Sequence, residues 1–121
     1  MVDAPPAPLK LSHLSLAVGD LDVAHAFYRD VMGLQTERHD DAVHVRWPDF
    51  LFILEAAPPA ERAKFHFGFR VESPEDVDKW NERFRAAGAH ILAGPSNRDG
   101  DRALFVTDPD NYTIEIFYEP A

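Results

Sequence analysis

The sequence predicts an α+β fold in which one chain contains two βαβββ modules. The first observation is the order of the elements, because a strand, a helix and three further strands are predicted in the first half and again in the second. The second is that a His and a Glu stand at matching places in each half, the His in the first strand and the Glu in the last. A repeat that carries the same polar pair is typical of a duplicated structural unit. The length of 121 residues suits one domain.

The first module is predicted to cover residues 9–55. Residues 9–18 alternate and predict a strand, which ends before Asp20, a residue that can cap a helix. Apolar residues then recur at spacings of three and four over residues 21–31, which predicts a helix that Gly33 ends. Turn-forming residues separate three further strand candidates, at residues 34–37, 43–47 and 50–55.

The second module is predicted over residues 63–118, after a proline-containing connector at residues 56–62. Its first strand, residues 65–71, alternates apolar side chains with others. The serine, proline and two acids at residues 73–76 predict the start of a helix, and Gly88 predicts its end. The remaining strands are expected at residues 89–92, 102–107 and 112–118.

Composition and charge exclude several classes of function. The net charge of −9 argues against a nucleic-acid partner, and the lack of cysteine excludes thiolate metal ligands, disulfides and a cysteine nucleophile. The first residues do not resemble a signal peptide, and no apolar run is long enough to span a membrane. We therefore expect a cytoplasmic protein with a small-molecule partner. Residues 1–8 contain three prolines and are expected to form a flexible tail, which leaves residues 9–121 as a single domain.

Four polar residues stand out because each points away from the apolar face of its predicted strand: His13, Glu55, His66 and Glu115. Two imidazoles and two carboxylates on a concave sheet would suit Fe, Mn, Co, Ni or Zn, and open coordination positions would take water or substrate. Each residue alone also has a simpler explanation. A histidine on a strand has many other uses, and a glutamate near a strand end is usually solvated.

Two segments resemble the vicinal-oxygen-chelate superfamily, which includes glyoxalase I, fosfomycin- and bleomycin-resistance proteins and extradiol dioxygenases. The segment LSHLSLAVGDLDVAHAFYRDVMGLQ is similar to the opening of that family, and FVTDPDNYTIEIFY is similar to its closing strand. The resemblance implies paired βαβββ modules around a metal held by His13, His66 and Glu115. It also implies that Glu55 matches the extra carboxylate seen in glyoxalase I, so that Glu55 and Glu115 are catalytic candidates.

Differences from the relatives narrow the expected reaction. Extradiol dioxygenases carry a Tyr at the position of Phe105 and a Gly at that of Asn111, and fosfomycin-resistance proteins carry a Lys at that of Pro95. We therefore favour a metal-dependent lyase or isomerase similar to glyoxalase I, acting on a small oxygenated metabolite that chelates the metal. The alternative is a metal-free protein that binds an antibiotic or another small molecule. The candidate substrate-binding residues are Ser15, Arg70 and Phe105.

A homodimer is expected because each module supplies only half of a closed cleft and single-domain members of this family usually pair two chains. In such a dimer His13 and Glu55 of one chain would meet His66 and Glu115 of the other, and the twofold axis would produce two identical sites. The sequence leaves open the substrate, the metal and whether the site is shared between chains.

Overall fold

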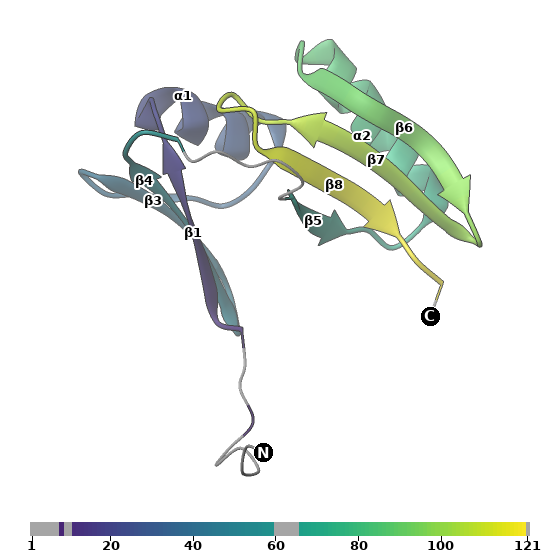
Figure 1. The fold of residues 1–121 in the computed structure, drawn as a ribbon, viewed down its shortest axis with the longest axis horizontal. Coiled ribbons are helices and arrows are strands. Elements are labelled where there is room, and N and C mark those ends of the chain that lie inside the picture. The colour runs from purple at the N-terminus through teal and green to yellow at the C-terminus, as the bar shows by residue number, and fades with distance from the viewer. Residues whose placement is uncertain (1–7, 9–10, 60–65, 121) are drawn as a thin grey trace, which may run out of the picture.

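The computed structural model describes residues 8, 11–59 and 66–120 of the chain. It contains two βαβββ modules, each with a four-stranded mixed sheet and a helical segment (Figure 1). The predicted α+β architecture is therefore confirmed. The predicted flexible tail, except for residue 8, and the predicted strand starts at residues 9 and 65 lie outside the described residues.

The first sheet has the strand order β1-β4-β3-β2. Its strands are β1 (His13–Val18), β2 (Glu37–Arg38), β3 (Ala42–Trp47) and β4 (Phe50–Ala56). β1 runs parallel to β4, and the other neighbouring strands are antiparallel. This arrangement places β1 at one edge of the sheet and the two-residue β2 at the other.

The second sheet repeats this topology with the order β5-β8-β7-β6. Its strands are β5 (His66–Arg70), β6 (His90–Arg98), β7 (Asp101–Thr107) and β8 (Thr113–Tyr118). β5 runs parallel to β8, while β7 is antiparallel to both of its neighbours. β5 therefore has the edge position that β1 has in the first sheet.

The helices begin and end where the sequence predicts. The Asp20 side chain accepts hydrogen bonds from two amides at the start of α1 (Leu21–Ala26), which continues as a π-helical segment over Phe27–Val31. The Ser73 side chain caps α2 (Pro74–Ala86) in the same way. Both predicted end positions, Gly33 and Gly88, have positive φ angles, of 70° and 75°.

Three strands differ from the prediction, the first because β1 begins at His13 and residues 11 and 12 are not part of it. The predicted strand at residues 34–37 is reduced to β2, Glu37–Arg38. β6 runs on from the predicted residues 89–92 to Arg98, although it contains Pro95. A proline is tolerated there because β6 is an edge strand and its register with β7 shifts around Ala93 and Ser96.

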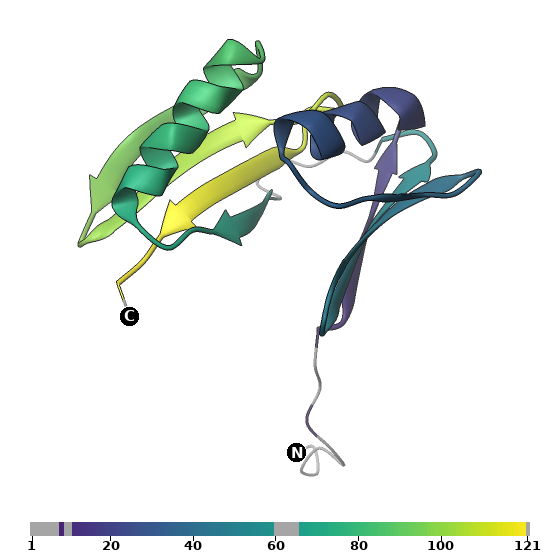
Figure 2. The same ribbon diagram turned by 180° about the vertical axis from the view of Figure 1, so that it is seen from behind.

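One apolar core joins the modules. It contains residues from both sheets and both helices, and the π-helical segment that continues α1 packs against α2 through Phe27 and Phe84, whose ring centroids lie 6.5 Å apart. The Tyr28 hydroxyl donates a 2.7 Å hydrogen bond to Asp108, in the turn before β8. Both helical segments lie on the side of the molecule that faces the viewer in Figure 2, where α2 crosses in front of the second sheet. The helix-packed sheet faces are therefore buried, and the opposite faces remain accessible.

Candidate functional site

All four predicted ligands lie on the sheet faces that point away from the core. Burial alternates along the strands as the sequence indicates: Leu16 and Val18 are buried while His13 is exposed, and Ile114 and Ile116 are buried on either side of Glu115. The candidate site is therefore built on accessible sheet surface.

The second module brings two of the predicted ligands together. His66 on β5 and Glu115 on the neighbouring β8 have their Nε2 and Oε1 atoms 3.6 Å apart. The register pairs Glu115 with Gly68, so the two ligand positions are offset by two residues along parallel strands. The side chains are 49% and 24% exposed, respectively, which leaves both accessible to an added ligand.

Aromatic rings flank this His–Glu pair. Phe105 lies directly opposite Glu115 in the register, and its ring makes an edge contact with His66 at a centroid distance of 5.8 Å. Phe117 has the same strand parity as Glu115 and covers Gly68, since a Cβ atom added at Gly68 would lie 3.2 Å from the Phe117 ring. Glycine at this position lets the ring approach the strand beside the ligand pair.

The first module holds its two predicted ligands farther apart. His13 pairs with Leu51 and Glu55 pairs with Ala17, so the two positions are offset by four residues. At a rise of about 3.3 Å per residue this offset is about 13 Å, twice that of the second module. The position that matches Glu115 in the register is Ile53, because it pairs with Ser15, two residues after His13. The structure therefore does not bring His13 and Glu55 together.

The other predicted site residues have different surroundings. Ser15 lies on β1, on the same face as His13, opposite Ile53. The guanidinium of Arg70 forms a 3.0 Å ion pair with the Glu119 carboxylate and donates to the Glu119 carbonyl oxygen at 3.2 Å. Arg70 is therefore engaged at the C-terminal end of β8 rather than directed at the ligand pair.

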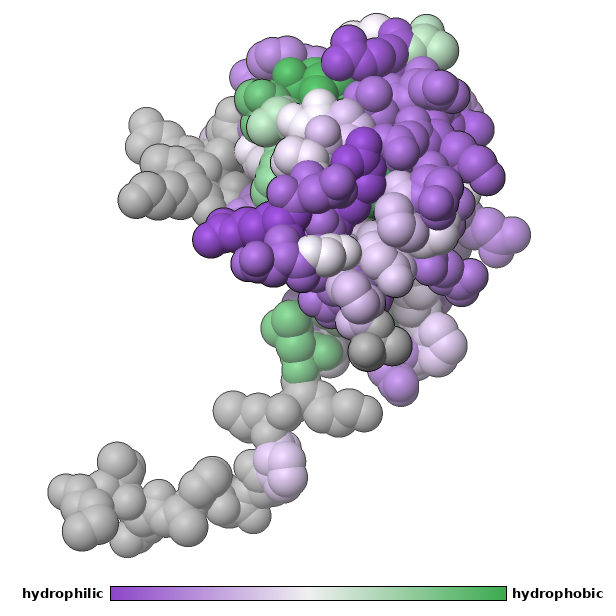
Figure 3. Space-filling model, turned by 90° about the vertical axis from the view of Figure 1, so that its right-hand side faces the viewer, coloured by the Kyte–Doolittle hydropathy of each residue, from purple (hydrophilic) through white to green (hydrophobic). Residues whose placement is uncertain are grey.

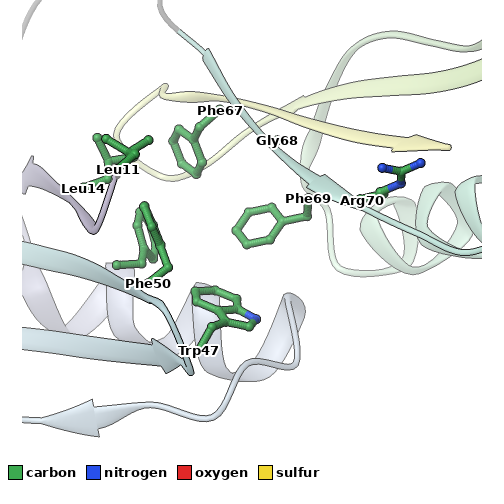
Figure 4. Close-up of a pocket in the computed structure, with 9 residues that line it drawn as sticks. Leu11, Leu14, Trp47, Phe50, Phe67, Gly68, Phe69 and Arg70 are labelled. Atoms are coloured by element: carbon green, nitrogen blue, oxygen red, sulfur yellow. The ribbon is translucent and has the colours of Figure 1, made fainter. Parts of the chain in front are cut away.

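Within the described residues of one chain, His13 does not join His66 and Glu115 in a three-ligand group with all donor atoms within 4.8 Å of one another. The two modules face each other across a cavity of about 430 Å³, which is lined mainly by apolar side chains from both sheets. Phe67 and Phe69 of β5 face Trp47 and Phe50 across this space, and the Arg70 side chain points away from it (Figure 4). The surface at the far end of the second module is mostly hydrophilic by comparison (Figure 3).

The sequence profile of the Glyoxalase/Bleomycin resistance protein/Dioxygenase superfamily matches residues 10–116. This chain belongs to that superfamily. Its two-module fold also agrees with solved structures: a glyoxalase-related enzyme from Fulvimarina pelagi aligns with a TM-score of 0.80 at 20% identity, over 92% of this chain and 88% of that one. Such a likeness establishes the fold.

Several relatives in the superfamily are enzymes with different activities. A lactoylglutathione lyase of Haemophilus influenzae is 27% identical, with 89% of this chain and 91% of that protein covered. A glutathione transferase FosA of Serratia marcescens is 26% identical, over 88% of this chain and 78% of that protein. A manganese-dependent 2,3-dihydroxybiphenyl 1,2-dioxygenase of Geobacillus genomosp. 3 is 30% identical over 91% of this chain, which spans only 36% of that protein. These relatives support enzymatic activity in general.

Two features of this superfamily member were missed in the sequence. Phe117 was not singled out, although its parity relative to Glu115 gives its face directly. The register of β1 against β4 could not be predicted, because parity distinguishes the two faces of a strand but not positions two residues apart on one face.

None of the described helices has the length and apolar character that crossing a membrane would require.

Proposed function

We propose that this chain is a divalent-metal-dependent enzyme whose site is built around His66 and Glu115. The observation that carries the proposal is the 3.6 Å approach of the imidazole and the carboxylate on an accessible sheet face. An imidazole nitrogen and a carboxylate oxygen at adjacent strand positions can bind one metal ion after a small rotation of either side chain. Zn, Fe, Mn, Co and Ni all accept this donor set.

His13 is the proposed third ligand. It lies on the outward face of β1, and its Nδ1 atom is 3.0 Å from the Ser12 hydroxyl, an interaction that would leave Nε2 for the metal. The resulting set of two histidines and one carboxylate leaves coordination positions for substrate. A bound metal of this kind would polarise a carbonyl or hydroxyl oxygen of the substrate.

The surroundings of the His–Glu pair support a substrate that combines adjacent oxygens with an apolar group. The oxygens would replace water on the metal, while Phe105 and Phe117 provide apolar ring surface on either side of Glu115. Ser15 can contact the substrate from the His13 side, since it lies on the same face two residues along. Arg70 could contribute a positive charge only if it separated from Glu119.

The register bears on the reaction type. A fourth ligand matching Glu115 in the first module would stand at Ile53, and Glu55 lies two residues beyond it. We therefore propose that three residues hold the metal and that Glu55 lies outside the ligand set unless β4 changes its register. This weakens the expected resemblance to glyoxalase I, whose extra carboxylate was the reason to favour lyase or isomerase chemistry.

We also propose that the site forms between two chains. β1 and β5 are edge strands of separate sheets, and the ligand faces of both sheets point outward from the chain's own core. A second copy that places its β1 beside β5 would bring its His13 to His66 and Glu115.

Metal analysis tests the proposed function. Protein purified without chelator, or reloaded with Mn, Fe, Ni or Zn, should bind the ion, and His66→Ala and Glu115→Ala should each lower the bound metal by one ion per chain. His90→Ala is the matched control, because His90 is an exposed histidine on β6 of the same sheet. Unchanged metal binding in both ligand variants would reject the proposed site, whereas a parent protein that takes up none of these ions would favour the metal-free binding protein.

A further inference from the structure

A second cluster of metal-ligating side chains lies on the hairpin formed by β2 and β3. Glu37 stands directly opposite His44 in the antiparallel register, on the same face of the sheet. His39 follows two residues after Glu37, and its amide donates a 2.8 Å hydrogen bond to the Ala42 carbonyl, which closes the hairpin. The alternation of side chains therefore places all three on one face, with the small Ala42 opposite His39.

We propose that Glu37, His39 and His44 form a transition-metal site of their own, separate from the one built on His66. One donor atom from each of the three residues lies within 4.8 Å of the other two. Ligands around one zinc ion stand roughly 3.3 Å apart, given metal–ligand distances of about 2.0–2.1 Å in tetrahedral geometry. The three side chains therefore need to close by about 1.5 Å at most, which rotation of partly exposed side chains allows.

The contacts within the cluster orient the ligands. Arg46 Nε donates to Glu37 Oε2 at 2.8 Å, while Glu37 Oε1 faces His39 Nε2 at 3.7 Å. A carboxylate held through one oxygen is positioned to bind a metal through the other. The rings of His39 and His44 lie 4.4 Å apart between centroids, which is close enough for one metal ion to bind a nitrogen atom of each ring.

The charged side chains of the hairpin carry a net negative charge before a metal binds. Arg46 neutralises Glu37, and this positive charge opposes a cation, but the exposed Asp40 and Asp41 in the turn contribute two negative charges. Two neutral imidazoles and one carboxylate favour Zn, Ni, Co or Cu over Mg or Ca, which prefer oxygen ligands alone. A bound ion would fasten the two-residue edge strand β2 to β3.

Zinc titration of tag-free protein by calorimetry tests this site apart from the first. In a His66→Ala background, which removes the other site, the chain should still bind about one zinc ion. Adding His44→Gln should eliminate that binding, whereas adding His90→Gln, which alters an exposed histidine outside both clusters, should leave it intact. Zinc should also raise the melting temperature of the His66→Ala chain, and His44→Gln should remove this rise. If the His66→Ala chain takes up no zinc, or if the His44→Gln addition keeps it, the proposal is wrong.

A measurement on the unaltered protein covers the case in which a variant fails to fold. Paramagnetic Co²⁺ should broaden the ring-proton NMR signals of His39 and His44 while those of His90 stay sharp. Equal broadening of all three would show unspecific adsorption and overturn the site. Because His66 is not needed for this binding, loss of metal at the first site would leave the result unchanged.

Discussion

The shared-site proposal makes a quantitative prediction for mixed chains. His13→Ala and His66→Ala should each abolish metal binding at the shared site when present alone. In a heterodimer of the two variants, one site lacks both histidines and the other receives His13 from one chain and His66 with Glu115 from the other. Half of the sites in each heterodimer are then intact.

Random exchange of subunits determines what fraction of the sites recovers metal binding. An equal mixture of the two chains gives about half heterodimers, so about one quarter of all sites should bind metal again. The assay is metal bound per chain after the chains have been mixed, partly unfolded to permit exchange, and refolded. Because each variant alone binds no metal at the shared site, any binding above that of the separate variants requires two different chains in one site.

A second mixture is the matched control. His66→Ala and Glu115→Ala both alter the second module, so no combination of these chains contains an intact site. This mixture carries the same number of substitutions and undergoes the same exchange procedure, and it should show no gain in bound metal. If the first mixture also shows no gain in bound metal while dimers demonstrably exchange, the shared-site reasoning is refuted and all ligands must come from a single chain.

Three further predictions concern the site and its support. Glu55→Ala should leave metal affinity within a few-fold of the parent, because its register position lies beyond the ligand set, and loss of binding would contradict this. Gly68→Ala should cost about 1–3 kcal/mol in denaturant unfolding, because the added methyl group would meet the Phe117 ring; an unchanged stability would contradict the close approach. Burial raises the pKa of the Asp108 carboxyl above 3.8, so the folded chain holds this proton more tightly than the unfolded chain. The free energy of unfolding of the parent, relative to that of Asp108→Asn, should therefore increase as the pH falls from 7 toward 3.8. Melting temperatures of the two proteins that change equally with pH would refute this prediction.

The sequence determines which face of a strand a residue occupies but not its distance from a partner on the next strand. Alternating apolar residues placed His66 and Glu115 on the accessible face, and the structure confirms that face. Glu55 lies on the same face of β4 as Ile53, so the alternation of side chains was consistent with Glu55 as a partner for His13. The register of β1 against β4 depends on how the whole module packs, and it puts Ile53 where a matching ligand would stand.

Contacts between the modules were not predictable from local patterns. In the sequence Tyr28 is one of the apolar positions of the predicted first helix. In the structure its hydroxyl donates a hydrogen bond to Asp108, 80 residues later, and both side chains are buried. The Asp108 carboxylate also accepts a 2.8 Å hydrogen bond from the Tyr112 amide. Asp108, which the sequence indicates only as a turn residue, thus connects the first helical segment to the residues before the last strand through buried hydrogen bonds, and only the tertiary structure shows this.

This packing gives the physical reason for the proposed sharing of the site. The chain buries the helix-packed faces of both sheets in one core, and β1 and β5 remain as edge strands with their ligand faces directed outward. A rotation that brought His13 to His66 within the chain would have to break the stacked Phe27 and Phe84 contact and the Tyr28–Asp108 hydrogen bond. Losing a buried hydrogen bond costs about 1–3 kcal/mol, and separating the aromatic side chains exposes apolar area as well. In the proposed dimer, association of two chains would reach the same ligand set without either loss.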